Sequence, residues 1–476
     1  MNFARSNQCT ALARWCGSSS KLRTSALSVA SRSRSNCLKN CRRTYGTTRP
    51  VSSAGRADAL GAPRETSELP TKLEQIIRES IMTTGPISMA TYMQMCLSHP
   101  THGYYMNPDN AILGTRGDFI TSPEISQVFG ELLGIWHLTR WEAAGRPPRI
   151  KIVELGPGRG TLMADMLRAM SQIRACTGAI KSVHLVETSA AMREHQRSLL
   201  TPAGKSLSWK YFWWDTVEDV IDHTKGDEYT MLVAHEFFDA LPVHLLEKTA
   251  QGWHELRIGC TTEPTLKGML EPKTDCLRLV REPHPSSQST VLGASSRRFA
   301  SLPIGARIEV SPTSYKIARQ ITRLLGSSRS LGGSGLIIDY GNDHVHGNSL
   351  RLMIIFQAFR EHKIVDIFSR PGQSDLTANV DFAYVKEAMA DGVTTHGPIS
   401  QSAFLEGMGI TVRVNSLMRN AKTEDRRTEI ARAARRLVDS SGMGREYKVL
   451  GVTADPLQKH NGKAGDSAEQ IWPFAQ

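Results

Sequence analysis

The sequence predicts an α/β fold with a doubly wound, Rossmann-like sheet, and three observations from residue 150 onward support this prediction. Short apolar runs typical of buried strands alternate with stretches of helical periodicity. A glycine-rich turn directly follows the first of these strands, and an acidic loop directly follows the third. Because ligands of such sheets bind at the carboxyl ends of the strands, we expect the turn and the loop to face one crevice.

The alternation of strands and helices is clearest between residues 150 and 247. The helical stretch after the glycine-rich turn places Leu162, Met166 and Met170 on one stripe, which is typical of a helix packed against a sheet. The predicted elements are, in order, a strand at 150–155, a helix at 161–173, a strand at 182–187, a helix at 190–200, and two strands joined by a loop within 229–247.

Further elements flank this region on both sides. An N-terminal helical and loop extension is expected over residues 66–145, with helices at 71–81, 88–99 and 127–145. The principal domain is expected over residues 146–453, with an insertion near 264–302, a loop near 342–400 and a polar tail over 454–476. Its later predicted elements are strands at 253–259, 306–310, 333–341 and 445–453 and a helix at 424–439.

The positive charge of the chain is concentrated at its N-terminus. The net charge is +12, yet residues 1–57 contain eleven Lys and Arg and no Asp or Glu. Without these eleven charges the rest of the chain carries only +1. The main body is therefore nearly neutral, and we expect no nucleic-acid partner for it.

Residues 1–57 are rich in Arg and Ser and free of acidic residues, which is the composition of a mitochondrial transit peptide. A membrane potential that is negative inside draws such a cationic segment inward. The alternative is a disordered basic tail that binds nucleic acid. From this composition we expect import into the mitochondrial matrix. Arg43, two residues before Tyr45, resembles a matrix-protease site, so we expect cleavage after Tyr45.

Two classes of site are not expected in this chain. No stretch approaches the roughly 18 apolar residues that a membrane-spanning helix needs, so we expect no stable membrane insertion. No cluster of metal ligands is visible, and we expect no metal cofactor. The cysteines beyond the N-terminal segment form no C-x-x-C pair, which fits a reducing compartment; they are Cys96, Cys176, Cys260 and Cys276.

The glycine-rich turn reads Gly156-Pro-Gly158-Arg-Gly160, which departs from the common phosphate-binding motifs. A dinucleotide fingerprint requires G-x-G-x-x-G, and here the third glycine comes one residue early. A P-loop is excluded because no Lys-Ser/Thr pair follows the last glycine. The plain alternative is an ordinary tight connection between a strand and a helix.

Two acidic residues near the turn favour a cationic nucleoside ligand. Glu154, just before the turn, would attract the sulfonium and ammonium groups of S-adenosylmethionine and repel a diphosphate. Glu187, at the end of the second strand, is placed to accept hydrogen bonds from both ribose hydroxyls, a position that dinucleotide folds share. We therefore expect S-adenosylmethionine as the cofactor, with an NAD-linked oxidoreductase as the alternative.

The loop after the third strand, AHEFFDALPVH (234–244), contains the second candidate site. Glu236 and Asp239 lie there among aromatic residues, at the strand end that faces the cofactor turn. The alternative is that Phe237 and Phe238 belong to the core and that both carboxylates are simply solvated.

These motifs and several others resemble the mitochondrial MidA-like family of protein arginine methyltransferases that act in respiratory complex I assembly. The resemblance extends in order over about residues 70–453. The matching segments are HGYYM (102–106), GDFITSPEISQVFGELLG (117–134), ELGPGRGTL (154–162), EFFDALPVH (236–244), DYG (339–341), SDLTANVDF (374–382) and GMGREYKVL (442–450).

The resemblance implies a class I S-adenosylmethionine-dependent methyltransferase fold with N-terminal helices and insertions. It also implies symmetric dimethylation of an arginine on a complex I core subunit in the matrix. The TSPEIS segment would close over the methionine end of the cofactor, although it also fits a helix start with Ser122 as the cap and Pro123 as the first helical residue. The implied cofactor residues are Glu154, Gly156, Gly158, Gly160, Glu187, Ser122, Pro123 and Glu124.

Glu236 and Asp239 are the candidate catalytic residues that follow from this resemblance. A guanidinium has a pKa above about 12 and is a poor nucleophile while its charge is delocalised. Carboxylates that bind it would orient one nitrogen toward the methyl group and localise the charge on the others. His235 and His244 could accept the released proton, although a histidine in such a loop is more often structural.

Some features leave alternatives open. Asp375 and Asp381 in SDLTANVDF serve either substrate contact or packing around Phe382. His235 stands where most relatives are expected to have Asn. The apolar hexamer Leu352–Gln357 would expose a sticky patch within a polar loop, so it is either a real insertion or an unremoved intron. The competing function is a catalytically idle assembly chaperone that retains the methyltransferase fold.

Overall fold

The computed structural model describes residues 70–106, 121–201, 209–223, 226–260, 277–327, 330–353, 364–454 and 471–475. The predicted transit peptide at 1–57 lies outside these residues, as do positions 354–357 of the predicted insertion. No helix in the described ranges is long and apolar enough to cross a membrane.

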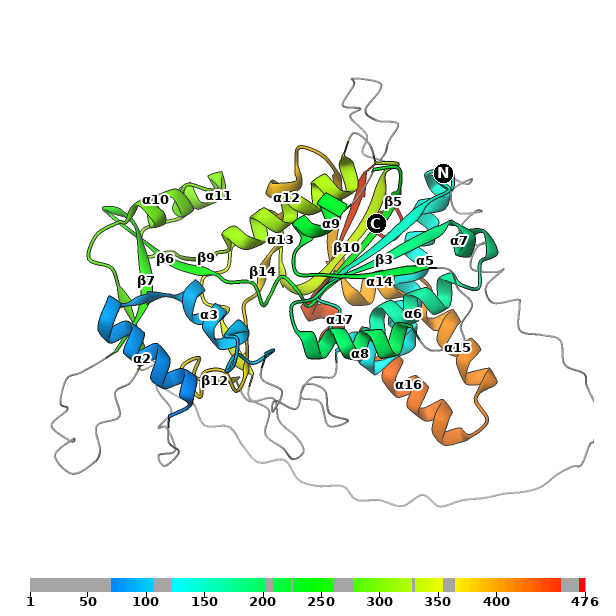
Figure 1. The fold of residues 1–476 in the computed structure, drawn as a ribbon, viewed down its shortest axis with the longest axis horizontal. Coiled ribbons are helices and arrows are strands. Elements are labelled where there is room, and N and C mark those ends of the chain that lie inside the picture. Colours follow the sequence, from blue (N-terminus) through cyan, green and yellow to red (C-terminus); the bar gives the residue numbers. More distant parts are fainter. Residues whose placement is uncertain are drawn as a thin grey trace, which may run out of the picture.

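An eight-stranded sheet forms the centre of the molecule (Figure 1). Seven strands follow the order β15–β16–β10–β5–β2–β3–β4, and the short β14 pairs with β10. The strands from β10 to β4 are parallel, whereas β16 runs antiparallel to both of its neighbours. The predicted doubly wound sheet is thus confirmed. Its strands are β2 (Ile150–Leu155), β3 (Ile180–Val186), β4 (Lys210–Trp214), β5 (Tyr229–His235), β10 (Gly333–Asn342), β14 (Val380–Asp381), β15 (Thr394–Ser400) and β16 (Tyr447–Ala454).

The direction in which strands are added reverses beside β2. The chain first builds β3 and β4 on one side of β2 and then returns to place β5 and β10 on the other side. Leu155 at the end of β2 lies opposite Ala234 near the end of β5. The turn after β2 and the loop after β5 therefore leave the same edge of the sheet side by side, which is where ligands of such sheets bind.

Helices cover both faces of this sheet, and side chains along β5 show the two cores. Met231 and Val233 belong to one core, and Leu232 and Ala234 to the other. The first core contains side chains from α5 (Gln127–Ala143), α6 (Thr161–Met170), α7 (Arg174–Ala179), α8 (Ala190–Leu200), α14 (Gln401–Gly407), α15 (Ile410–Asn420) and α16 (Glu424–Val438). The second contains side chains from α9 (Val217–His223), α12 (Pro312–Gly326) and α13 (Phe382–Met389).

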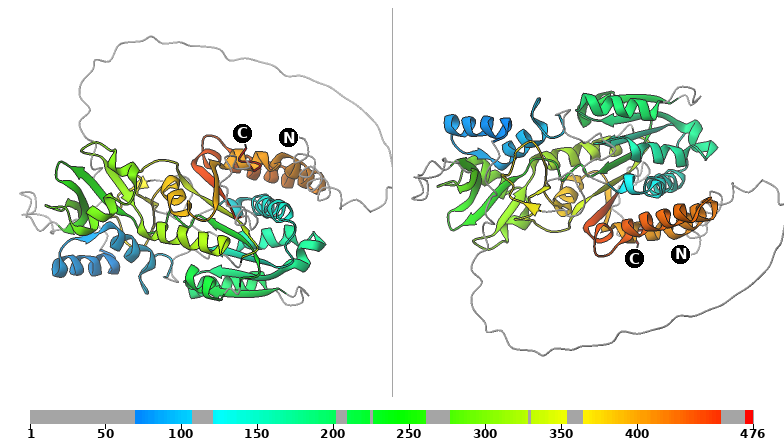
Figure 2. Two further views of the ribbon diagram at one scale, coloured as in Figure 1. Left: turned by 90° about the horizontal axis from the view of Figure 1, so that it is seen from above. Right: turned by 90° about the horizontal axis from the view of Figure 1, so that it is seen from below.

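A second, antiparallel sheet and the N-terminal helices lie at one end of the molecule, away from the α15–α16 hairpin (Figure 2). Leu73 of α2, Met93 of α3 and Ile258 of this sheet share one apolar cluster. Leu376 of a small third sheet joins the same cluster. These elements are α2 (Lys72–Thr84), α3 (Met89–Ser98), the second-sheet strands β1 (Ile87–Ser88), β6 (His244–Thr249), β7 (Gly252–Cys260), β8 (Leu277–Arg281) and β9 (Arg307–Val310), and the third-sheet strands β11 (Arg351–Met353), β12 (Ile364–Val365) and β13 (Asp375–Thr377).

Several regions contain more structure than the sequence predicted. The strand after the acidic loop is present, but as β6 it pairs with β7 and β9 and stays outside the main sheet. The patterns did not predict β4 and α9. The region near 264–302 contributes β8, α10 (Ser287–Gly293) and α11 (Arg297–Ala300). The described part of the region near 342–400 contains α13, β15 and the short strands β11, β12, β13 and β14.

The described end of the polar tail is packed against the domain. Ile471 belongs to the first core, and the indole N–H of Trp136 in α5 donates a hydrogen bond to the carbonyl of Trp472 at 3.2 Å. Residues 471–475 of the predicted polar tail are therefore packed against α5.

Candidate active site

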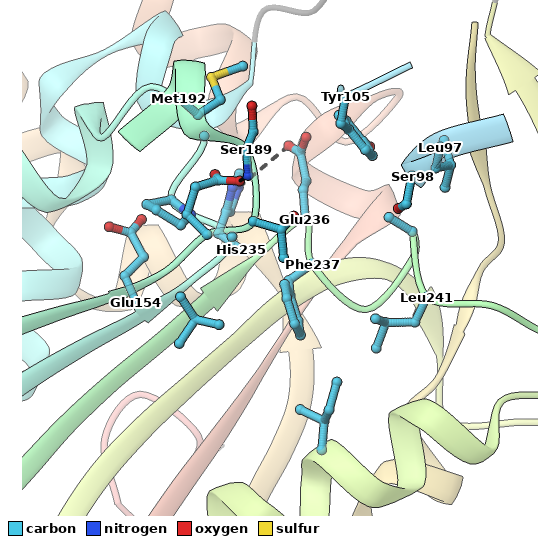
Figure 3. Close-up of a pocket in the computed structure, with 18 of the residues that line it drawn as sticks. Leu97, Ser98, Tyr105, Glu154, Ser189, Met192, His235, Glu236, Phe237 and Leu241 are labelled. Carbon is cyan, nitrogen blue, oxygen red and sulfur yellow. Dashed lines mark hydrogen bonds and ion pairs between the residues drawn. The ribbon is translucent and has the colours of Figure 1, made fainter. Parts of the chain in front are cut away.

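A cavity of about 570 Å³ lies at the carboxyl ends of β2 and β5. The loops that follow β2, β3, β4 and β5 line it, together with α12 and part of the N-terminal extension. Figure 3 shows Glu154 on one side of the cavity, Tyr105 and Leu97 on the opposite side, and Glu236 between them. One cavity thus contacts both constellations that the sequence singled out.

The glycine-rich turn after β2 has a backbone that only glycine adopts easily. Gly156 has a φ of 63° and Gly158 a φ of 49°, both in the left-handed region. A Cβ atom at Gly156 would lie 2.9 Å from the Phe237 ring, so this side of the turn has no room for a side chain. Both glycines line the cavity. Gly160 does not, and instead its left-handed backbone starts α6.

Glu154 is a buried carboxyl group at the cavity wall. Its side chain lies at the end of β2, and its Oε2 has no hydrogen-bond partner. Burial raises the pKa of Glu154 to about 8, with a smaller contribution from Glu187. A buried, unpartnered carboxyl destabilises the fold unless a cation neutralises it. This observation fits the cationic ligand that the sequence predicted.

Glu187, at the end of β3, is held in place by neighbouring polar groups. Its Oε1 accepts a hydrogen bond from the Ser189 N–H at 2.8 Å, and its Oε2 accepts one from Gln196 Nε2 at 3.3 Å. Gln196 Nε2 also donates to the Gly158 carbonyl at 2.7 Å. Gln196 therefore ties the glycine-rich turn to Glu187. No sequence pattern indicated this role, because Gln196 lies in the middle of α8.

The loop after β4 supplies a further part of the wall that the sequence did not predict. Asp215, Thr216 and Val217 line the cavity directly after this edge strand. The aromatic run KYFWW that forms β4 was the available signal, since aromatic residues favour strands.

The TSPEIS segment contacts the cavity with only some of its residues. Pro123 and Glu124 line it, and Glu124 forms an ion pair with Arg159 at 3.3 Å. Ser122 does not line it; its buried hydroxyl donates to Gln401 Oε1 at 3.2 Å. The N-cap of this short helix, α4 (Ser122–Ile125), is Thr121, so the predicted start with Ser122 as the cap is wrong by one residue.

Glu236 directly follows β5 in a strained conformation. Its φ is 50°, which is uncommon for a residue with a Cβ atom. Its Oε1 accepts a hydrogen bond from the Tyr447 hydroxyl at 2.6 Å, and the Tyr340 hydroxyl lies 2.6 Å from that of Tyr447. Burial raises the pKa of Glu236 to about 8, and the Tyr447 hydrogen bond opposes this rise. The carboxyl is thus oriented at the cavity by two tyrosines.

Asp339, the residue of β10 directly after its last pair with β5, fixes the shape of the loop that carries Glu236. Its Oδ2 accepts the backbone N–H groups of Phe237 at 3.2 Å, Phe238 at 2.9 Å and Asp239 at 3.2 Å. Its Oδ1 accepts the Tyr340 N–H at 2.9 Å. Burial raises the pKa of Asp339 to about 7, while these donors favour the ionised form. This role explains the DYG motif.

Asp239 is buried behind the cavity wall. It is 5% exposed and is not among the residues that line the cavity, although Glu236 and Asp375 are. Burial raises the pKa of Asp239 well above its ordinary value, and the neighbouring Asp339, Asp375 and Glu236 add to the rise. Together these four residues form a carboxyl cluster at the cavity wall, and a cation would relieve their mutual repulsion.

The two histidines of the acidic loop are placed differently. Burial lowers the pKa of His235 to about 3, so the ring is neutral, and its Nε2 lies 3.6 Å from Glu236 Oε1. His244 lies within β6, where its Nδ1 is 2.6 Å from Glu255 Oε1. In the described part of the chain, no group of three or more His, Cys, Asp or Glu side chains could hold a metal ion.

Comparisons with known proteins agree with this geometry. A family model described as "Putative S-adenosyl-L-methionine-dependent methyltransferase" matches residues 132–399. The mitochondrial protein arginine methyltransferase NDUFAF7 of Rattus norvegicus is 34% identical over 86% of this chain and 90% of its own length. The Homo sapiens protein of the same name is 34% identical over 88% and 92%, and the Drosophila melanogaster homolog 34% over 87% and 93%.

A solved structure supports the fold. The chain superposes with a TM-score of 0.62 on a protein from Burkholderia thailandensis that is described as a likely methyltransferase and was crystallised with S-adenosyl-homocysteine. That structure is 23% identical and covers 82% of this chain and 98% of its own. The class I methyltransferase fold expected from the sequence is confirmed. The chain therefore belongs to this family of S-adenosylmethionine-dependent methyltransferases, which includes the mitochondrial protein arginine methyltransferases, and its cofactor is S-adenosylmethionine.

Proposed function

We propose that the protein is a mitochondrial matrix enzyme that methylates an arginine on a core subunit of respiratory complex I, with symmetric dimethylarginine as the product. The names of relatives that match most of the chain support arginine as the substrate and mitochondria as the location. The observation that carries the proposal is one cavity lined both by Glu154, whose buried Oε2 has no hydrogen-bond partner, and by Glu236 in the loop after β5.

The cofactor would lie along the wall formed by the turn after β2. Gly156 and Gly158 would present their backbone to the adenosyl group, and Glu187 would accept hydrogen bonds from the ribose hydroxyls. Glu154 would bind the cationic methionine end, because its buried Oε2 has no hydrogen-bond partner in the protein. Pro123 and Glu124 would cover that end.

Two further predicted residues would act from outside the cofactor site. Ser122 would support the TSPEIS segment from behind through its hydrogen bond with Gln401. Gly160 would set the start of α6, and so the position of the turn, through its left-handed backbone.

The substrate guanidinium would enter from the side of Glu236. The ionised Glu236 carboxylate would accept two of its N–H groups and orient a third nitrogen toward the methyl group. Asp239 would stabilise the cation from behind the wall by its charge. Much of the rate would come from this positioning, since the bound cofactor supplies a methyl group on a sulfonium that leaves readily.

Methyl transfer is followed by the loss of one proton from the methylated nitrogen. A lone pair of the guanidinium nitrogen forms a bond to the methyl carbon while the carbon–sulfur bond breaks, and the bonding electrons stay on sulfur. The methylated nitrogen then releases one proton to Glu236, which passes it to solvent. His235 is a poor acceptor because its pKa is about 3, and His244 is held by Glu255.

Methyl transfer with labelled S-adenosylmethionine and a recombinant complex I core subunit tests the proposal. We expect label on the subunit, symmetric dimethylarginine in its hydrolysate, and loss of transfer in Glu236→Gln. The exposed α14 variant Glu406→Gln is the matched control and should retain the activity. Tight binding of the subunit by the wild type without any transfer would instead support the idle assembly chaperone.

A further inference from the structure

A further carboxyl group on the cavity wall belongs to the third sheet. Asp375, the first residue of β13, is 8% exposed and lines the cavity together with Glu236. The hydroxyl of Tyr105 donates a hydrogen bond to Asp375 Oδ1 at 2.8 Å. Burial raises the pKa of Asp375 to about 6. Asp381, in the same SDLTANVDF motif, instead caps α13 and forms an ion pair with Arg298, so the motif divides between site and scaffold.

Asp375 and Tyr105 come from two separate additions to the methyltransferase sheet, which meet at this wall. Tyr105 lies after α3 in the N-terminal extension, and Asp375 lies in the third sheet. The hydroxyl of Tyr92 in α3 donates to the Ile367 carbonyl at 2.8 Å, and its ring packs edge-on against Phe368. Neither addition belongs to the main sheet, yet together they hold one carboxyl at a defined place on the cavity.

The position of Asp375 differs from that of Asp239 in one decisive respect. The charge of Asp375 raises the pKa of Glu236, and the charge of Glu236 raises the pKa of Asp239, so both aspartates lie near Glu236. Only Asp375 lines the cavity. A cation that reaches Glu236 from the Tyr105 side therefore meets Asp375 directly, while Asp239 remains behind the wall.

We infer that Asp375 is the second carboxylate that binds the substrate guanidinium, opposite Glu236, and that Tyr105 orients it; this inference rests on the proposed arginine methyltransferase function. The guanidinium offers five N–H donors in a planar fork, so two carboxylates on different edges can both accept from it while one nitrogen stays open to the methyl group. The two additions that carry Tyr105 and Asp375 thus give the site its selectivity for a cationic side chain.

The test compares an arginyl peptide with its neutral citrulline counterpart. Acetyl-Gly-Arg-Gly-amide and acetyl-Gly-citrulline-Gly-amide are titrated into the full chain loaded with S-adenosylhomocysteine, by calorimetry. We expect the wild type to prefer the arginyl peptide and Asp375→Asn to lower that preference about tenfold, because one charge-assisted hydrogen bond is lost. Asn keeps the size of the side chain and still accepts from Tyr105, so the wall should stay in place.

Controls separate a binding role from a structural one. Asp391→Asn, at a position whose side chain is 89% exposed, should leave the preference unchanged. Each variant should bind S-adenosylhomocysteine as the wild type does, which shows that the cavity is intact. Tyr105→Phe retains the carboxylate and should lower the preference less than Asp375→Asn.

The outcomes are distinguishable from failure of the proposed function. A wild type that binds both peptides equally would overturn the proposed function itself. A wild type that prefers arginine, together with an Asp375→Asn variant that keeps the whole preference, would overturn only the role of Asp375.

Discussion

Glu154→Gln should change cofactor binding and the stability of the cofactor-free protein in opposite directions. In the folded protein burial raises the pKa of Glu154 from 4.5 to about 8. In the unfolded chain the Glu154 carboxyl ionises at a lower pH than in the folded protein. It therefore favours unfolding increasingly as pH rises from about 4.5 to about 8, and this destabilisation is constant above about pH 8. At 1.36 kcal/mol per pKa unit, ionisation of Glu154 lowers the free energy of unfolding by at most about 3 kcal/mol at pH 7 and about 5 kcal/mol above pH 8.

Glutamine removes this ionisation but remains a buried polar group, so part of the gain is lost. We expect the cofactor-free variant to unfold at a higher urea concentration than the wild type at pH 8, and at nearly the same concentration at pH 4.5. Its affinity for S-adenosylmethionine should fall about 10- to 100-fold, because a charge-assisted hydrogen bond to the cation is lost.

Urea unfolding at the two pH values and calorimetry with S-adenosylmethionine measure both effects. Glu194→Gln, at a position whose side chain in α8 is 77% exposed, is the matched control and should change neither. A Glu154→Gln variant that is less stable at pH 8 and binds the cofactor as tightly as the wild type would refute the reasoning.

Three further predictions concern the walls of the cavity. Gly156→Ala combines a left-handed backbone with a Cβ atom 2.9 Å from the Phe237 ring, so S-adenosylhomocysteine affinity should fall about tenfold in calorimetry; unchanged affinity would contradict this. Tyr447→Phe removes a hydrogen bond that lowers the pKa of Glu236, so the rise of kcat with pH should move to higher pH while cofactor affinity stays constant. If kcat rises over the same pH range as in the wild type, Glu236 does not act in its ionised form. Asp339→Asn places an amide where a carboxylate accepts four backbone N–H groups, so it should lower the free energy of unfolding by about 2 kcal/mol and reduce methyl transfer. An unchanged free energy of unfolding would show that the loop keeps its shape without the Asp339 carboxylate.

The sequence predicted correctly those parts of the fold that are encoded locally. The strand, glycine turn and helix around Gly156 are contiguous, and their pattern sufficed. Glu236 was placed at the cavity because the parallel-sheet rule brings the ends of neighbouring strands together. The strand β6 was also predicted, but its sheet was not, since pairing with β7 and β9 depends on tertiary contacts.

The remaining parts of the site depend on long-range contacts or on side-chain direction. Tyr447 is 211 residues from Glu236 in the sequence, and Tyr105 is 270 residues from Asp375, so no local pattern links either pair. Ser122 lies in the right segment but points into the core, which a one-dimensional motif does not reveal. The edge strand β4 was missed because its aromatic run lacks a clear alternation of apolar and polar residues.

A crystal structure of the protein with S-adenosylhomocysteine and an arginyl peptide tests the central claim most directly. We expect the methionine end of the cofactor on Glu154, its ribose on Glu187, and the peptide guanidinium on Glu236 with one nitrogen facing the sulfur. A cofactor bound away from the Gly156 turn, or a guanidinium that does not contact Glu236, would contradict it.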